Sequence, residues 1–148
     1  MVEAFMESRI VINVPAAKVW DALTNPEMTK HYMFGCEIVC DWKIGDSVLW
    51  KGAQDGVTYV KGYLVAFEKE KTLTMTAIDP NASYEDIPEN HLTATYQLTE
   101  NNNTTLLEVK QGDYTKVAEG AKRYKDTMSF GGWNTILESI KKLVEQGE

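Results

Sequence analysis

Apolar and polar residues alternate along most of the first 112 residues. In residues 4–14 the apolar side chains share one parity and the polar ones take the other: Met6, Ile10, Ile12 and Val14 against Glu7, Arg9 and Asn13. The alternation recurs in six later segments, residues 36–42, 48–50, 57–67, 72–78, 91–98 and 104–111. This pattern predicts antiparallel β-strands with one buried and one solvated face.

Helical spacing appears in two places. In "PAAKVWDALTNPE", Pro15 suits a first helical position and Asn25-Pro26 ends the helix, so Pro26 can open a second short one. The last apolar stripe runs through Trp133, Ile136, Leu137, Ile140, Leu143 and Val144. Residues 114–128 supply a first, irregular part of this C-terminal helical region. The predicted order is strand, two short helices, six strands and a long helix.

A sheet of seven strands is about 30 Å wide, whereas one helix covers about 10 Å. The sheet must therefore curve around the helix. We predict an α+β fold in which a curved antiparallel sheet grips the long C-terminal helix, with space left between them. Gly131 and Gly132 begin that helix. They either allow a close approach or an opening beside the sheet, or form a permissive helix end.

Large side chains are expected to line this space. The candidate ligand-binding residues are Trp42, Trp50, Tyr59, Tyr63, Met75, Tyr96, Met128 and Trp133. Aromatic residues on one strand face are ordinarily core residues. Buried tyrosine hydroxyls and tryptophan N–H groups nevertheless need hydrogen-bond partners, which a bound ligand or water would supply.

Residues suited to acid–base chemistry are few. His31 follows a short helix and is expected near the cavity opening, whereas His91 shares the parity of polar residues and should point to solvent. Lys61 and Glu108 are candidate inward polar contacts for a ligand, although the parity of Lys61 relative to Tyr59 and Tyr63 leaves its direction open. No catalytic, metal or cofactor motif is recognisable.

Two further features complete the search for a site. Cys36 and Cys40 would lie about 13 Å apart along a strand, too far for a disulfide, and they lack nearby metal ligands, so small buried apolar residues are expected. The acidic stretch 79–90 is the one long irregular segment, and its length suggests an opening or a lid.

Length and charge narrow the class of protein. The 148 residues suit a single domain covering 1–148, and the formal net charge of −7 argues against nucleic acid and anionic membranes as partners. We recognise neither a signal peptide nor an apolar run long enough to span a membrane. We therefore expect a soluble, cytoplasmic protein.

Four stretches carry a resemblance to a known family: "VPAAKVWDALTNPE", "KIGDSVLW", "VKGYLVAFEKEKTLTMT" and "GGWNTILESIKKLVE". Together they resemble the START-like (SRPBCC, helix-grip) superfamily. Within it, the chain is similar to the bacterial branch related to the C-terminal domain of the activator of the heat-shock protein 90 ATPase. Tyr32 replaces a commoner tryptophan. The resemblance implies a deep cavity between sheet and C-terminal helix and a role in the stress response, but it names no ligand.

Three hypotheses follow, in descending order. The first is a non-catalytic protein that binds a small apolar or aromatic molecule, without a cofactor. The second, implied by the resemblance, is a module that contacts a chaperone through exposed patches. The third is an enzyme of the cyclase or hydrolase type found on this fold, with His31 and a cavity carboxylate or tyrosine as acid and base.

Overall fold

The computed structural model describes residues 4–146 and contains one antiparallel sheet of seven strands. The strands are β1 (Phe5–Ile12), β2 (Cys36–Val39), β3 (Ser47–Gly52), β4 (Thr58–Glu68), β5 (Thr72–Ala77), β6 (Leu92–Asn101) and β7 (Thr104–Gly112). Their order across the sheet is β1-β7-β6-β5-β4-β3-β2, so only the β1–β7 neighbours are distant in sequence.

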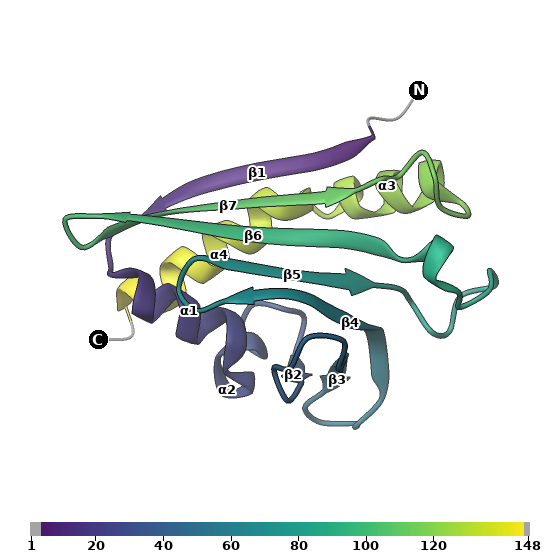
Figure 1. The fold of residues 1–148 in the computed structure, drawn as a ribbon, viewed down its shortest axis with the longest axis horizontal. Coiled ribbons are helices and arrows are strands. Elements are labelled where there is room, and N and C mark those ends of the chain that lie inside the picture. Colours follow the sequence, from purple (N-terminus) through teal and green to yellow (C-terminus); the bar gives the residue numbers. More distant parts are fainter. Residues whose placement is uncertain (1–3, 147–148) are drawn as a thin grey trace.

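The helices lie mainly on one side of this sheet (Figure 1). They are α1 (Ala16–Thr24), α2 (Pro26–Thr29), α3 (Gly120–Ser129) and α4 (Gly132–Gln146), with a short 3-10 turn at Pro88–Asn90. In Figure 1, α4 crosses behind the long strands, and α1 and α2 follow β1 at one end. The α+β helix-grip architecture predicted from the sequence is confirmed. None of the helices in residues 4–146 is long and apolar enough to cross a membrane.

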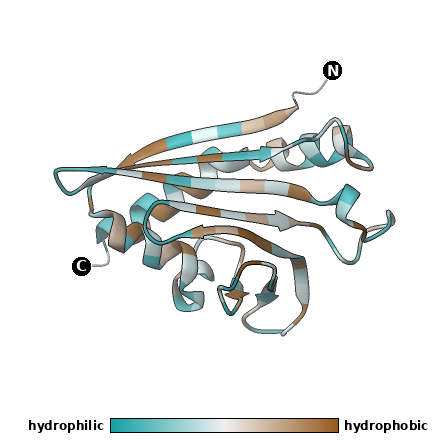
Figure 2. Cartoon of the chain, in the orientation of Figure 1, coloured by the Kyte–Doolittle hydropathy of each residue, from teal (hydrophilic) through white to brown (hydrophobic). Residues whose placement is uncertain are grey.

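The alternation along the strands sorts side chains between the two faces. Hydrophobic and hydrophilic bands succeed one another along β7 in Figure 2, where Leu107 and Val109 are buried and Glu108 and Lys110 are not. The buried side of α4 includes Trp133, Ile136, Leu137, Ile140 and Val144, and it packs against the inner face of the sheet. The predicted helical stripe and strand parity therefore build one core.

The glycine pair separates α3 from α4. Gly131 has φ +105° and Gly132 has φ +62°, and such values are strained for residues with a Cβ atom. A Cβ at Gly131 would also collide with the Thr135 hydroxyl. The pair therefore separates α3 from α4. Helix α4 begins at Gly132, and its next residue, Trp133, is on the buried side.

The strand predicted for residues 36–42 is shorter than expected, and Trp42 is not part of it. Strand β2 ends at Val39, and Trp42 occupies a loop with left-handed backbone, φ +62°. Its ring packs against Phe67 with centroids 5.7 Å apart, and Trp20 meets the same Phe67 at 5.3 Å. Trp42 therefore packs against the core from a loop, in an aromatic cluster with Phe67 and the α1 residue Trp20.

Candidate ligand-binding cavity

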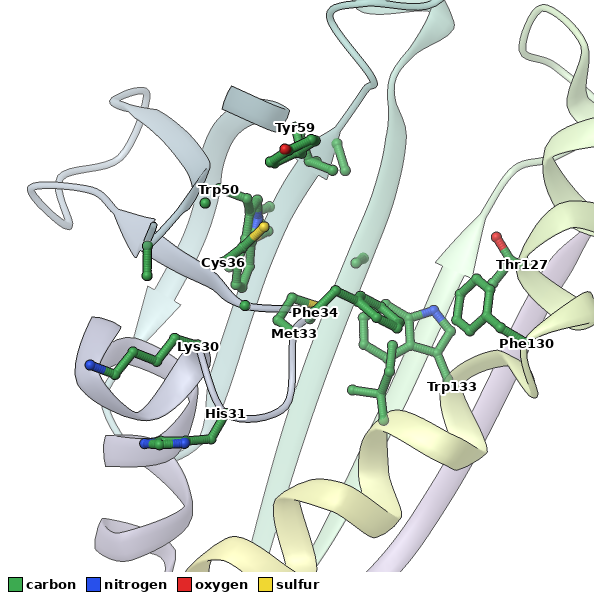
Figure 3. Close-up of a pocket in the computed structure, with 18 of the residues that line it drawn as sticks. Lys30, His31, Met33, Phe34, Cys36, Trp50, Tyr59, Thr127, Phe130 and Trp133 are labelled. Atoms are coloured by element: carbon green, nitrogen blue, oxygen red, sulfur yellow. The ribbon is translucent and has the colours of Figure 1, made fainter. Parts of the chain in front are cut away.

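A cavity of about 890 Å³ lies between the inner face of the sheet and the α3–α4 region (Figure 3). Five of the predicted residues line it: Trp50, Tyr59, Met75, Tyr96 and Trp133. They come from β3, β4, β5, β6 and α4, so the wall joins residues far apart in the sequence. This volume is in the range of small-molecule sites, about 300–1,000 Å³.

The other three predicted residues are not part of this lining. Trp42 is in the aromatic cluster around Phe67. Tyr63 is on the outer face, 43% exposed, and stacks on His91 with centroids 5.7 Å apart. Met128 is half-exposed on α3, while its neighbours Thr127 and Phe130 do line the cavity.

Tyr59 reaches the cavity because of a β-bulge. The β3–β4 register passes from Trp50↔Val60 to Lys51↔Thr58, which leaves Tyr59 as the extra residue. A bulge turns a side chain out of the regular alternation. Tyr59 and Tyr63 have the same parity, yet only Tyr59 faces the cavity.

Gln111 is a lining residue that the sequence prediction missed. Its side-chain oxygen Oε1 accepts two hydrogen bonds, from Trp133 Nε1 at 2.9 Å and from the Tyr114 hydroxyl at 2.8 Å. Tyr114 is almost fully buried, and burial raises the pKa of its hydroxyl to about 12, which keeps it a neutral donor. Gln111 has the same strand parity as Leu107 and Val109, and this parity could have indicated that its side chain faces inward.

Tyr96 places a second polar group in the wall. The residue is 3% exposed, its ring meets the Trp133 ring edge-on at 5.6 Å, and burial raises the pKa of its hydroxyl. No side chain or backbone group in residues 4–146 hydrogen-bonds to this hydroxyl. Every fully buried side-chain N or O atom in these residues has a hydrogen-bond partner, so the unpaired Tyr96 hydroxyl is not fully buried. The hydroxyl therefore retains access to the cavity space.

Charged groups occur where the cavity meets solvent. Lys30 pairs with Glu27 at 3.2 Å, and the exposed His31 follows it in the chain. On the sheet side, the Tyr59 hydroxyl donates to Asp55 Oδ2 at 2.5 Å. This hydrogen bond lowers the pKa of Asp55 and raises that of Tyr59. Within the described residues, His31 has no hydrogen-bond partner that would position it as a catalytic base.

An aromatic pair joins the two walls at the surface. Phe34 and Phe130 meet edge-on with centroids 5.2 Å apart, and both line the cavity. Phe34 is 68% exposed and has φ +54°, in the turn that links α2 to β2. The buried Thr29 anchors this turn, because the Ile38 N–H donates to its hydroxyl at 3.0 Å.

The outer face of the sheet carries a separate polar cluster. His91 was expected in solvent, but its side chain is only 3% exposed. Its Nδ1 lies 2.9 Å from the Thr76 hydroxyl and its Nε2 lies 3.0 Å from Asp86. Asp86 also pairs with Lys61 at 2.5 Å. The 79–90 segment therefore covers His91, and none of its residues lines the cavity.

The remaining candidate polar and thiol groups have different positions. Lys61 faces outward in the cluster just described. Glu108 lines a separate hollow on the outer face with Arg9, so the prediction that either is an inward contact is wrong. Cys36 is buried and lines the cavity, whereas Cys40 is half-buried. Residues 4–146 contain no cluster of three or more His, Cys, Asp or Glu side chains able to hold a metal.

The sequence matches the family described as "Activator of Hsp90 ATPase homolog 1-like protein" over residues 13–145. The chain belongs to this family. The match begins just after β1 and spans α1, α2, strands β2–β7, α3 and most of α4, so it includes the residues that line the cavity. No curated protein matches the sequence at a significant level.

Solved structures agree with this assignment. The protein ChR145 from Cytophaga hutchinsonii is 34% identical, with a TM-score of 0.73, and the match covers 99% of this chain and 97% of that one. The Aha1 dimer from Colwellia psychrerythraea is 18% identical, with a TM-score of 0.71 and coverage of 100% and 99%. The Hsp90 activator PFC0360w from Plasmodium falciparum is 14% identical, with a TM-score of 0.70 and coverage of 96% of each chain. The last two matches show the shared fold.

Proposed function

We propose that this family member binds a small, largely apolar molecule in the cavity between the sheet and α4. The observation that carries the proposal is the Tyr96 hydroxyl, which has no protein partner in residues 4–146 and belongs to a residue of the cavity wall. A dry core would leave such a group at a cost of about 1–3 kcal/mol, whereas a ligand or water satisfies it. Trp50, Met75, Phe130 and Trp133 provide the apolar contact surface.

Native mass spectrometry tests this proposal. The protein is purified gently from its own host, weighed intact, and then denatured to release bound molecules. A stoichiometric small molecule in the intact spectrum supports the proposal and gives its chemical class. As a direct check, the recombinant protein is titrated with an apolar fluorescent dye. A Kd that does not change in the Trp133→Ala variant would contradict cavity binding.

A second candidate function follows from the comparisons. Membership of the activator family and the fold shared with a Plasmodium Hsp90 activator favour contact with a chaperone ATPase. The test is the ATP turnover of a purified Hsp90 from the same host, with and without this protein. A stimulation that persists when the cavity is filled with dye would place the chaperone contact on the exterior surface.

A further inference from the structure

The hydrogen bond from the Trp133 indole fixes the orientation of the Gln111 side-chain amide. An indole Nε1–H only donates hydrogen bonds, so the atom 2.9 Å from Trp133 Nε1 must be the amide oxygen. The Tyr114 hydroxyl donates to the same oxygen. Both common acceptor positions of Oε1 are then occupied, and the NH₂ group has to point away from Trp133 Nε1 and Tyr114.

The NH₂ group of Gln111 has no protein partner in residues 4–146. A fully buried amide nitrogen without a partner would stand out, but none occurs in the part of the chain that the structure describes. Since Gln111 sits on the inner face and lines the cavity, its NH₂ group has access to the cavity space. It offers two N–H donors there.

The Tyr96 ring lies beside the same indole ring. Register pairs Ala94 with Gln111 and Tyr96 with Val109, so Tyr96 and Gln111 are diagonal neighbours on adjacent strands. Such diagonal positions are about 7–8 Å apart, which long side chains can span. Both side chains also contact Trp133, one through its Nε1 and one through its ring edge. The three groups form one polar corner.

This corner carries no charged side chain. The charged lining residues Lys30 and Asp55 already have partners in Glu27 and Tyr59. Figure 3 shows Lys30 and His31 on the opposite wall from Trp133. A carboxylate at the corner would be removed from water without a countercharge, which costs several kcal/mol. An uncharged acceptor oxygen carries no such cost.

We propose that the cavity recognises a neutral, mainly apolar molecule through one carbonyl oxygen, which accepts hydrogen bonds from Gln111 Nε2 and the Tyr96 hydroxyl. A carbonyl oxygen has two lone pairs and so matches two donors. The hydrocarbon or aromatic remainder contacts Trp50, Met75 and Phe130. This inference rests on the proposed ligand-binding function and specifies the chemistry of its ligand.

A matched pair of dyes tests the inference. The first is the naphthalene ketone prodan, and the second is the analogue in which a propyl group replaces the propionyl group. They differ in shape by little more than the carbonyl oxygen, and both are fluorescent. We expect prodan to bind the wild-type protein about tenfold more tightly, as two hydrogen bonds of modest net strength imply.

Gln111→Glu is the decisive variant. At pH 8 a glutamate oxygen still accepts from Trp133 and Tyr114, but the N–H donors are replaced by a second acceptor. Both dyes exclude water from the new carboxylate and should bind more weakly, but only prodan also loses its donor, so the prodan Kd should rise about tenfold more than the propyl analogue's Kd. Tyr96→Phe should weaken prodan by a smaller factor. Gln97→Glu, the same change on the outer face of β6, serves as the control and should alter neither Kd.

The possible results separate the two proposals. Equal affinities for both dyes, together with no response to Gln111→Glu or Tyr96→Phe, would overturn carbonyl recognition and leave cavity binding standing. If neither dye binds the wild-type protein, both the proposed function and this inference fail. Thermal unfolding of each variant shows whether the fold is retained, and Tyr96→Phe provides a second reading if Gln111→Glu does not fold.

Discussion

The two faces of the sheet treat polar side chains in opposite ways. On the outer face, Thr76, His91, Asp86 and Lys61 satisfy one another through distances of 2.5–3.0 Å. On the inner face, the Tyr96 hydroxyl is left without a protein partner among the described residues. The outer-face groups are paired within the protein, whereas the inner face has a hydroxyl that faces the cavity without a protein partner among the described residues.

This difference separates structural polar groups from groups available for binding. A Thr–His–Asp arrangement attracts attention as a catalytic motif, yet here each member is held by another side chain under the 79–90 segment. The less conspicuous tyrosine and glutamine beside Trp133 border open volume. Burial alone does not distinguish the two sets, since His91 and Tyr96 are both buried. The two sets differ in whether the side chain has a hydrogen-bond partner within the described residues.

Trp133→Ala should give the largest effect. Removing this ring deletes buried apolar surface and the hydrogen bond to Gln111, so we expect the free energy of unfolding to fall by about 3–5 kcal/mol. Urea denaturation measures this loss, and prodan titration should show that binding is lost as well. Trp42→Ala is the matched control outside the cavity: it should lower stability yet retain prodan affinity. Loss of binding in both variants would contradict the cavity assignment.

His91→Ala should destabilise the protein without affecting the cavity. It removes two hydrogen bonds, to the Thr76 hydroxyl and to Asp86, and the stacking on Tyr63. Each hydrogen bond contributes about 0.5–1.5 kcal/mol, so the free energy of unfolding should fall by about 1–3 kcal/mol. Urea denaturation at pH 7 measures the change, and the prodan Kd should match that of the wild type. The exposed His31 gives the control, because His31→Ala removes no hydrogen bond. Equal stability losses in the two variants would contradict the structural role of His91.

Ala94→Phe should weaken ligand binding and not folding. Ala94 lies on the inner face of β6 between Met75 and Gln111, so a phenyl ring there occupies cavity volume. We expect the prodan Kd to rise about tenfold or more, equivalent to about 1.4 kcal/mol, as measured by titration. Gln97→Phe places the same ring on the outer face and should leave the Kd unchanged. A tight-binding Ala94→Phe protein would show that the dye binds elsewhere.

Asp86→Asn should have the smallest effect, and the effect should depend on pH. The hydrogen bond from Lys61, followed by that from His91, lowers the pKa of Asp86 in the folded protein. Its contribution is therefore present above the unfolded-state pKa of about 3.9 and is lost as pH falls through the lower folded-state pKa.

Urea denaturation of the wild type and Asp86→Asn at pH 7 and pH 3 measures this dependence. The stability difference between the two proteins should be larger at pH 7. Asp41→Asn, at an exposed carboxylate without a partner in residues 4–146, should show no such trend. A difference that grows toward low pH would have the wrong sign for this explanation.

The fold could be predicted because alternation and helical spacing are local. The parity of Leu107 and Val109 and the stripe from Trp133 to Val144 required no knowledge of distant contacts. The Gly131-Gly132 pair indicated a special helix start, but the sequence left open whether it made an opening or a simple end. The structure shows a break between two helices with positive φ at both glycines.

The site was harder to predict because two segments depart from regular strand geometry and one lining residue is polar. The bulge that turns Tyr59 inward, while Tyr63 stays outward, depends on β3–β4 register. Strand β2 ends at Val39, so Trp42 lies in a loop to which the strand alternation does not apply. Gln111 was overlooked because it is polar, although its parity was that of a core residue. Local patterns fix which face a regular residue occupies, whereas bulges and covering loops depend on the assembled sheet.

The four tryptophans fall into two groups with different surroundings. Trp50 and Trp133 line the cavity, whereas Trp20 and Trp42 pack around Phe67 at the other side of the core. Resonance energy transfer falls steeply with distance, so a naphthalene placed in the cavity would accept energy more efficiently from Trp50 and Trp133 than from Trp20 and Trp42. Tryptophan emission would thereby report occupancy of the proposed site, and Trp20 and Trp42 would serve as the less affected comparison in the same chain.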